Sequence, residues 1–254
     1  MKKRKKLDIR KLVLVLLMGI FAGLFIFSAF KIVSYLLDNE ENRKIKNTTK
    51  EMVTIEDGEY KVDFKKLKEQ NPDTIAYLKV NNTNIDYVVV RGTDNSYYLK
   101  HNFNKEYNIS GWIFADYKNK FDGSDKNIVI YGHSTKDGSM FGTLPNALNE
   151  KWQTDSNNLV IKLVTEQGES KYQIFSTYEI VPEDYYITTN FNSDNEFSTF
   201  INKLLSRSNY DFGVEVTKDD SILTLSTCNI SGSMRIVVHA KKIEDKKEEL
   251  NMVE

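Results

Sequence analysis

An uncharged apolar segment close to the N-terminus constrains the fold more than any other feature. Residues 12–30 contain no charged side chain and are mostly Leu, Val, Ile and Phe. A helix needs about 20 apolar residues to cross a bilayer. The segment reaches that length if Lys31 extends its ammonium group to the membrane surface and residues 32–37 continue the helix. We therefore expect one transmembrane helix over residues 12–37.

A cleaved signal peptide is the competing interpretation. The apolar core of a signal peptide usually spans about 7–15 residues and ends at a small-residue cleavage site. This segment is longer, and Phe27-Ser28-Ala29-Phe30 is a poor cleavage site, so an uncleaved anchor is favoured. Residues 1–11 carry seven Lys or Arg against Asp8 alone. The positive-inside rule then predicts a single-pass protein of the cell membrane with a cytoplasmic N-terminus and the rest outside.

Composition limits what the exported part can be. Residues 12–254 hold 28 basic and 35 acidic side chains with no basic patch, which argues against nucleic-acid binding. The chain has one cysteine and so no internal disulfide, but about 200 residues can bury a sufficient core without one. We expect a basic cytoplasmic tail over 1–11, a stalk over 38–58, one compact extracellular domain over 59–245 and a charged tail over 246–254.

Most of the exported domain has a β-type pattern. Short apolar runs bounded by Gly, Asn and Asp turns predict about eight strands and a barrel or sandwich. The expected strands cover residues 75–80, 85–90, 111–116, 127–131, 159–164, 172–181, 221–227 and 235–243.

Helices are expected at three places in this domain. Phe197, Phe200, Ile201, Leu204 and Leu205 follow a helical repeat, and Ser193 or Asp194 could cap that helix. Residues 62–70 have helix-compatible spacing that ends at Asn71-Pro72-Asp73. A short helix is possible near residues 140–148.

Cys228 ends an apolar β-type run and precedes a short loop. The ordinary interpretation is a buried core cysteine. Strand alternation, however, assigns it to the mixed face with Thr224 and Ser226, whereas Leu223 and Leu225 form the better core face. A thiol at the end of a strand, where a cleft could lie, is a candidate nucleophile.

Two further residues could complete a site for acyl transfer by a thiol. His133 follows a predicted strand and precedes a glycine-containing loop, where a base would be presented. Arg235 starts the strand after Cys228, and a guanidinium there could stabilise an oxyanion, although it could also be a surface cation. Of the other histidines, His101 is expected on the surface, and His239 is expected to be structural because it lies about 13 Å along the strand from Arg235.

The motifs around these residues are those of a known family. Thr224-Leu225-Ser226-Thr227-Cys228, followed by Arg235, resembles the TLxTC…R signature of sortases, the membrane-anchored transpeptidases of Gram-positive bacteria. Tyr131-Gly132-His133 with Lys136-Asp137-Gly138-Ser139-Met140-Phe141 resembles the histidine loop of class B. Asp94-Asn95-Ser96-Tyr97-Tyr98-Leu99 and Gly111-Trp112-Ile113-Phe114-Ala115-Asp116-Tyr117 are also similar to class B segments. The resemblance covers roughly residues 71–243.

The resemblance implies a mainly β fold, an eight-stranded barrel with N-terminal helices and a helix between the late strands. It also implies that Cys228 is the nucleophile, His133 the general acid/base and Arg235 the oxyanion stabiliser. The positions that it suggests for substrate contact are Asn95, Leu99, Tyr131, Tyr186, Ile187 and Ser226.

The implied reaction needs no cofactor or metal. The enzyme would cleave a C-terminal sorting motif of secreted proteins through a thioacyl intermediate. It would then pass the acyl group to an amine of a peptidoglycan precursor or of a pilin. Two alternatives stay open at this point. One is a cysteine peptidase that only hydrolyses its substrate, and the other is a non-catalytic, membrane-tethered β-barrel binding protein.

Overall fold

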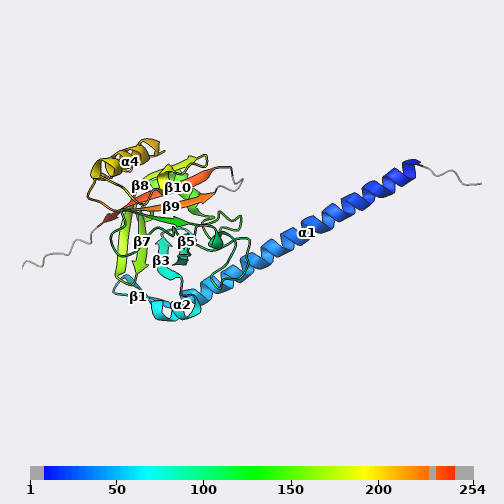
Figure 1. Ribbon diagram of the computed structural model, residues 1–254, viewed down its shortest axis with the longest axis horizontal. Coiled ribbons are helices and arrows are strands. Elements are labelled where there is room, and N and C mark those ends of the chain that lie inside the picture. Colours follow the sequence, from blue (N-terminus) through cyan, green and yellow to red (C-terminus); the bar gives the residue numbers. More distant parts are fainter. Residues whose placement is uncertain (1–8, 229–232, 244–254) are drawn as a thin grey trace, which may run out of the picture.

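The computed structural model describes residues 9–228 and 233–243, which form a β-barrel with one long helix extending from it (Figure 1). Eight strands close the barrel in the order β10-β8-β7-β3-β4-β5-β6-β9. The pairs β4/β5 and β6/β9 are parallel, and the other pairs are antiparallel. The predicted eight-stranded barrel is therefore confirmed. Its strands are β3 (Thr74–Val80), β4 (Asp86–Val90), β5 (Phe114–Ala115), β6 (Asn127–Tyr131), β7 (Val160–Thr165), β8 (Gly168–Ile180), β9 (Ile222–Cys228) and β10 (Arg235–Ile243).

Two strands differ from the prediction by more than one residue in length. β5 has two residues in place of the six expected over 111–116, because Gly111 adopts a positive φ of 56° and Trp112 N donates to Tyr98 O outside the sheet. β8 is a 13-residue strand that begins at Gly168, four residues before the expected start. It pairs with β7 through its first half and with β10 along most of its length.

A hairpin that the pattern analysis missed crosses the predicted boundary between the stalk and the domain. β1 (Val53–Glu56) and β2 (Glu59–Val62) pair antiparallel around Asp57 and Gly58, whose φ angles are 51° and 81°. Asp-Gly is a preferred sequence for a two-residue turn with positive φ at both positions. The dipeptide was therefore a signal for this hairpin.

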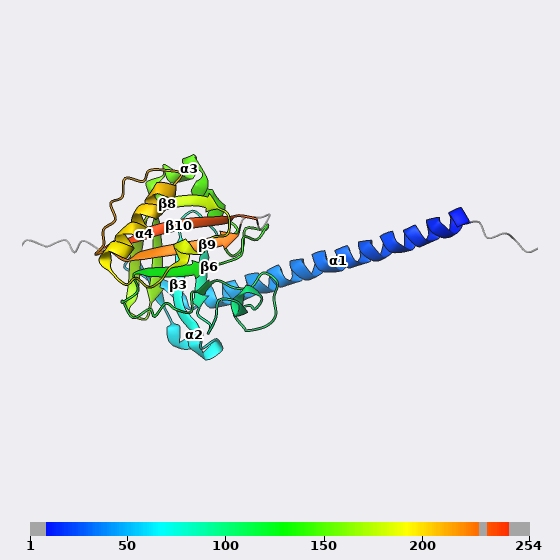
Figure 2. The same cartoon turned by 45° about the horizontal axis from the view of Figure 1, so that its top comes forward.

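The helix α4 (Asp194–Arg207), predicted between the late strands, covers the outer face of β8, β9 and β10 (Figure 2). Ser193 caps it, since its hydroxyl accepts from Glu196 N at 3.2 Å. Its buried face packs against outward-facing residues such as Ile222 and Val237, whereas Leu223 and Leu225 belong to the core cluster inside the barrel. The inward and outward alternation predicted for β9 is therefore present.

The other helices of the barrel domain are short. α2 (Phe64–Gln70) starts at an Asp63 cap, and α3 (Glu150–Gln153) is a single turn. The short helix expected near 140–148 is a 3₁₀ turn, η2 (Leu144–Leu148). Three other 3₁₀ turns are η1 (Tyr97–Leu99), η3 (Ser156–Asn158) and η4 (Tyr185–Ile187).

Helix α1 (Ile9–Lys50) contains the apolar segment and is, within the described residues, the one helix long and apolar enough to cross a membrane. It does not end where the apolar segment ends. Its C-terminal part lies against the barrel, where Asn42, Ile45 and Thr49 are buried. Asn42 Nδ2 donates to Asn108 Oδ1 at 3.0 Å and to Gly111 O at 3.1 Å. This part of the predicted stalk thus packs directly against the barrel.

Candidate active site

The register of three neighbouring strands brings the candidate catalytic residues to one edge of the barrel. β6 and β9 run parallel, and Tyr131 is opposite Ser226. β6 ends there, but Gly132 N still donates to Ser226 O at 3.3 Å, so the loop that carries His133 leaves the barrel beside the end of β9, where Cys228 lies. On the other side of β9, β10 pairs antiparallel and places Arg235 opposite Cys228. Adjacent strands are about 4.8 Å apart, so the backbone of Cys228 lies between those of the other two.

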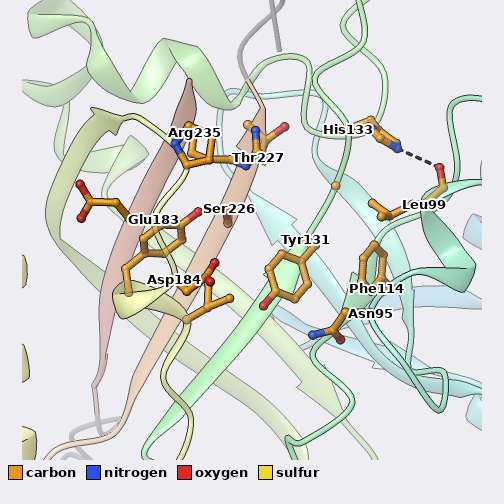
Figure 3. A pocket seen from close by; sticks show the side chains of 14 residues that line it. Asn95, Leu99, Phe114, Tyr131, His133, Glu183, Asp184, Ser226, Thr227 and Arg235 are labelled. Carbon is orange, nitrogen blue, oxygen red and sulfur yellow. Dashed lines mark hydrogen bonds between the residues drawn. The ribbon is translucent and has the colours of Figure 1, made fainter. Parts of the chain in front are cut away.

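The backbone of Cys228 ends β9, but its side chain lies outside the described residues. The site is therefore described from the residues around it. Figure 3 shows Arg235 and His133 on either side of Thr227, at the same end of a cavity.

The cavity has a volume of about 250 Å³. Every residue that the family resemblance suggested for substrate contact lines it. Asn95 and Leu99 come from the segment around η1, Tyr131 from β6, Tyr186 and Ile187 from η4, and Ser226 from β9. His133 and Arg235 line the same cavity. Sequence reasoning did not select the other lining residues, which are Phe114, Gly132, Pro182, Glu183, Asp184 and Thr227.

One hydrogen bond fixes the orientation of the His133 ring. Its Nε2 lies 2.9 Å from Leu99 O, the contact drawn in Figure 3. A carbonyl oxygen only accepts, so Nε2 carries a proton and Nδ1 holds the lone pair of the neutral ring. The preceding residue, Gly132, has no room for a side chain, because a Cβ there would collide with Ile113 and Phe141. The loop that follows β6 therefore packs closely against Ile113 and Phe141 just before His133.

Arg235 presents a buried donor to the site. Its side chain is half-buried, and Nη1 has no hydrogen-bond partner among the described residues. Glu183 lines the same cavity, but its carboxylate lies 3.7 Å from Arg207. A guanidinium is charged at all physiological pH values, and a buried donor without a partner is costly. Such a group is well suited to bind an oxygen that becomes negative.

A buried carboxylate fixes the wall opposite Arg235. Asp116, only 2% exposed, accepts from Tyr131 Oη and from Asn95 Nδ2, both at 2.8 Å. Burial, together with the charge of Asp116, raises the pKa of Tyr131 far above its usual range, so its hydroxyl stays a donor. Sequence reasoning missed Asp116. The available signal was its position at the end of a segment that resembles class B.

A pair of hydroxyl groups fixes the wall of the cavity that η4 forms. Tyr186 Oη lies 3.1 Å from Ser226 Oγ, and the tyrosine is almost fully buried. This contact ties η4 to β9 directly beside the cavity.

The other two histidines do not line the cavity. His101 stacks on Tyr97 with ring centroids 4.0 Å apart. His239 is fully buried between Thr224 Oγ1 and Tyr178 Oη, each 2.9 Å from a ring nitrogen. Burial lowers the pKa of His239 to about 3, so it is neutral near pH 7. Over residues 9–228 and 233–243, no group of three His, Cys, Asp or Glu side chains could hold a metal ion.

Comparison with known proteins identifies the family. The sortase domain model matches residues 78–243. Sortase B of Listeria monocytogenes is 34% identical over 87% of this chain and 93% of its own length. A crystal structure of Clostridium perfringens sortase B is 38% identical, with a TM-score of 0.68 over 72% of this chain and all of that one. Sortase B from Bacillus anthracis in complex with AAEK1 gives a TM-score of 0.74 at 33% identity over 83% of this chain and all of that one. The chain therefore belongs to the sortase family, as a class B cysteine transpeptidase.

Proposed function

We propose that this chain is anchored in the cell membrane by residues 12–37 and cleaves a C-terminal sorting motif of secreted proteins through a thioacyl-enzyme. The acyl group then passes to an amine of the cell wall or of a pilin. Protein substrates with sorting motifs and amine acceptors are general properties of the family. For this chain, the membrane anchor, the roles of the catalytic residues and the choice of acceptor are parts of the proposal.

In the first step, the Cys228 thiolate attacks the carbonyl carbon of the scissile peptide bond. The carbonyl oxygen becomes negative, and Arg235 stabilises it through Nη1. His133, as imidazolium, protonates the departing amine, and a thioester remains on Cys228. The support for Arg235 is its buried Nη1, which has no partner among the described residues. The support for His133 is its place in the cavity lining, on the loop that follows β6, the parallel neighbour of β9.

In the second step, an amine replaces the leaving group. The incoming nitrogen attacks the thioester carbonyl, the carbon–sulfur bond breaks, and an amide forms. His133 accepts the proton of the amine at Nδ1, since Nε2 donates to Leu99 O. Water in place of the amine would give hydrolysis, so the identity of the acceptor decides between transpeptidase and peptidase.

The cavity suits an extended peptide with mixed side chains. Leu99, Ile187 and the rings of Tyr131 and Tyr186 supply apolar surface, whereas Asn95 and Ser226 supply polar contacts. Asp116 holds Tyr131 and Asn95 in place. We assign these six lining residues to substrate binding.

The orientation of the chain follows from its charges. Residues 1–11 lie in the cytoplasm, the apolar part of α1 crosses the membrane, and the barrel lies outside the cell. The apolar side chains of this part are exposed along the helix, from Leu12 to Leu37, as expected for contact with lipid.

The observation that carries the proposal is that His133 and Arg235 line one cavity at the end of β9, where Arg235 lies opposite Cys228 in the ladder. The test is a mass-spectrometric screen of the soluble domain against libraries of sorting peptides, with and without an amine acceptor. We expect thioacyl formation on Cys228, and an amide product when the amine is present. The variant Cys228→Ala should fold normally and lose both cleavage and transfer.

Each contrary outcome removes a defined part of the proposal. More than a few per cent of activity in Cys228→Ala would exclude thiol catalysis. Hydrolysis that no amine diverts would indicate a peptidase. If alkylation of the thiol leaves every activity unchanged, Cys228 has no part in the reaction.

A further inference from the structure

A buried chain of hydrogen bonds crosses the outer face of the barrel, on the side that α4 covers (Figure 2). At its centre is His239, whose ring lies 2.9 Å from Tyr178 Oη on one side and 2.9 Å from Thr224 Oγ1 on the other. Tyr185 Oη donates to Tyr178 Oη at 3.1 Å, and Thr224 Oγ1 donates to Asn127 Oδ1 at 2.7 Å. The chain therefore passes through side chains of β8, β10, β9 and β6.

Both ends of this chain lie on the same short turn. Tyr185 is the first residue of η4. At the other end, Asn127 Nδ2 donates to Thr188 O at 2.9 Å and to Tyr186 O at 3.4 Å. The hydrogen bonds thus start at a side chain of η4, cross four strands and return to the backbone of η4.

The backbone carbonyls at the end of the chain determine the donor and the acceptor of every bond. A carbonyl oxygen only accepts, so Asn127 directs Nδ2 at η4 and Oδ1 at Thr224. The Thr224 hydroxyl gives its one proton to Oδ1 and therefore accepts from Nδ1–H of His239. The His239 ring is neutral near pH 7, so its Nε2 accepts from Tyr178, and the Tyr178 oxygen accepts from Tyr185. A neutral imidazole at position 239 joins the two halves because it donates on one side and accepts on the other.

The turn that this chain holds is a wall of the substrate cavity. Residues 181–193 connect β8 to α4 and contain no strand. Tyr186 and Ile187, which line the cavity, lie in this connection. The chain supplies three hydrogen bonds between the connection and the strands. A segment outside a sheet has no ladder to fix it, so its position depends on contacts of this kind.

Helix α4 holds the Tyr185 end of the chain from outside. Lys203 Nζ lies 3.7 Å from the centroid of the Tyr185 ring, and the guanidinium carbon of Arg207 lies 5.1 Å from it. A cation over an aromatic face is attracted by the ring electrons. The Tyr185 side chain is therefore fixed by α4 on one side and by Tyr178 on the other.

A break anywhere in the chain should reach η4. Tyr178, Thr224 and Asn127 are almost fully buried, so water has little access to a group that loses its partner. A buried donor or acceptor without a partner is costly, and hydrogen bonds in a series strengthen one another. Side chains on either side of a break would turn toward other partners, and the carbonyl groups of η4 would lose the Asn127 amide.

We propose that His239 is a positioning residue for the donor peptide, because the hydrogen-bond chain through its ring fixes η4 and the cavity wall that Tyr186 and Ile187 form. His239 does not line the cavity and acts through the turn alone. With the wall fixed in advance, peptide binding does not carry the cost of ordering it. The inference rests on the proposed function and identifies what shapes its peptide site.

Three variants break the chain outside the cavity lining. His239→Phe removes both ring nitrogens, Thr224→Val removes a hydroxyl and keeps the side-chain shape, and Tyr178→Phe removes a hydroxyl alone. Thr224→Ser keeps the hydroxyl and should behave as the unmodified chain. The matched control is Ser176→Ala, which removes a buried hydroxyl from the same strand as Tyr178. Ser176 Oγ donates to Leu204 O of α4 at 2.7 Å and is not part of the chain. If one variant does not fold, the other two still test the proposal.

The first measurement is amide hydrogen exchange of the full chain in detergent micelles, followed by mass spectrometry. The N–H groups of Ile187 and Thr188 donate within η4, each at 3.3 Å. Peptides that cover these residues should exchange about tenfold faster in the three variants, as expected for the loss of a buried hydrogen bond. The same peptides should be unchanged in Ser176→Ala and in Thr224→Ser.

The second measurement is single-turnover acylation with the donor peptide that the library screen selects. The apparent affinity for the peptide should fall about tenfold in the three variants, whereas the rate of acylation at saturating peptide should stay within about twofold. Alkylation of Cys228 by iodoacetamide requires no peptide site and should keep its rate. A variant that only destabilised the barrel would not separate these three values.

Every other result counts against the inference. Unchanged exchange in η4 would show that the chain does not hold the turn. Faster exchange with unchanged peptide affinity would show that the order of η4 has no part in peptide binding. Parallel losses in Ser176→Ala, or in the alkylation rate, would indicate general destabilisation. If no donor peptide acylates the unmodified chain, the proposed function fails and the role in peptide binding fails with it, while exchange alone decides whether the chain fixes η4.

Discussion

The replacement of Arg235 by Lys tests the oxyanion assignment more strictly than removal of the charge. Arg235 lies opposite Cys228 in the β9/β10 ladder, and its Nη1 is buried without a partner among the described residues. Lys would keep the positive charge at the start of β10. It would lose the planar fork of donors, and its ammonium is a more strongly hydrated point charge.

The expected defect is large and specific to one step. Loss of one oxyanion donor typically costs on the order of 10²–10³ in turnover, or about 2.7–4 kcal/mol of transition-state stabilisation. The ground-state carbonyl carries no full charge, so peptide binding should change much less than the rate of acylation. The assay is single-turnover formation of the thioacyl-enzyme, followed by mass spectrometry at several peptide concentrations. It separates the rate of acylation from the apparent affinity.

Lys241→Arg is the matched control, because it makes the reverse exchange six residues further along the same strand. Lys241 lies about 20 Å from Arg235 along β10, and its ammonium lies 3.1 Å from Asp220 Oδ2. Near-normal acylation in Arg235→Lys would refute the assignment of Arg235. An equal collapse in Lys241→Arg would show that the assay reports damage to the strand and not the loss of an oxyanion donor.

Two further predictions concern the fold around the site. A chain that starts at Asp38 should keep its melting temperature and peptide cleavage, whereas one that starts at Glu59 should melt several degrees lower, because it lacks Asn42 and Ile45, which pack against the barrel. Burial depresses the pKa of His239 to about 3, so the unfolded chain binds a proton that the folded chain does not, and stability falls as pH drops below about 6.5. Chemical denaturation should show His239→Gln losing roughly 2 kcal/mol less than the unmodified chain between pH 7 and pH 5. Identical pH profiles, or equal melting of the two truncated chains, would contradict these expectations.

The local sequence pattern was sufficient to predict most of the strands. The alternation from Ile222 to Ser226 separates residues that face the barrel interior from residues that face α4, and the spacing from Phe197 to Leu205 gives the buried face of that helix. These features depend on periods of 2.0 and 3.6 residues, which a sequence displays directly. The same reasoning missed the β1/β2 hairpin, although Asp57-Gly58 was a local signal for its turn.

The geometry of the site depends on information that no local pattern contains. The parallel pairing of β6 with β9 joins segments 95 positions apart, and it brings the loop with His133 beside the end of β9. Asp116 was missed for a similar reason. Its role depends on Asn95, from the segment before η1, and on Tyr131, from β6, which converge on its carboxylate in the folded chain. The family resemblance supplied the candidates for the cavity, and the strand register explains why they lie together.

A continuous set of contacts links helix α1 to His133, the candidate base. Asn42, on α1, donates to the carbonyl of Gly111. Gly111 has a positive φ and lies so close to the Tyr98 and Leu99 carbonyls that a Cβ would collide with them. The Leu99 carbonyl in turn orients His133. A flexible tether would let the barrel turn relative to the apolar segment, whereas α1 runs without interruption from that segment to its contacts with the barrel. The position of His133 relative to the apolar segment is therefore set by packing between α1 and the barrel.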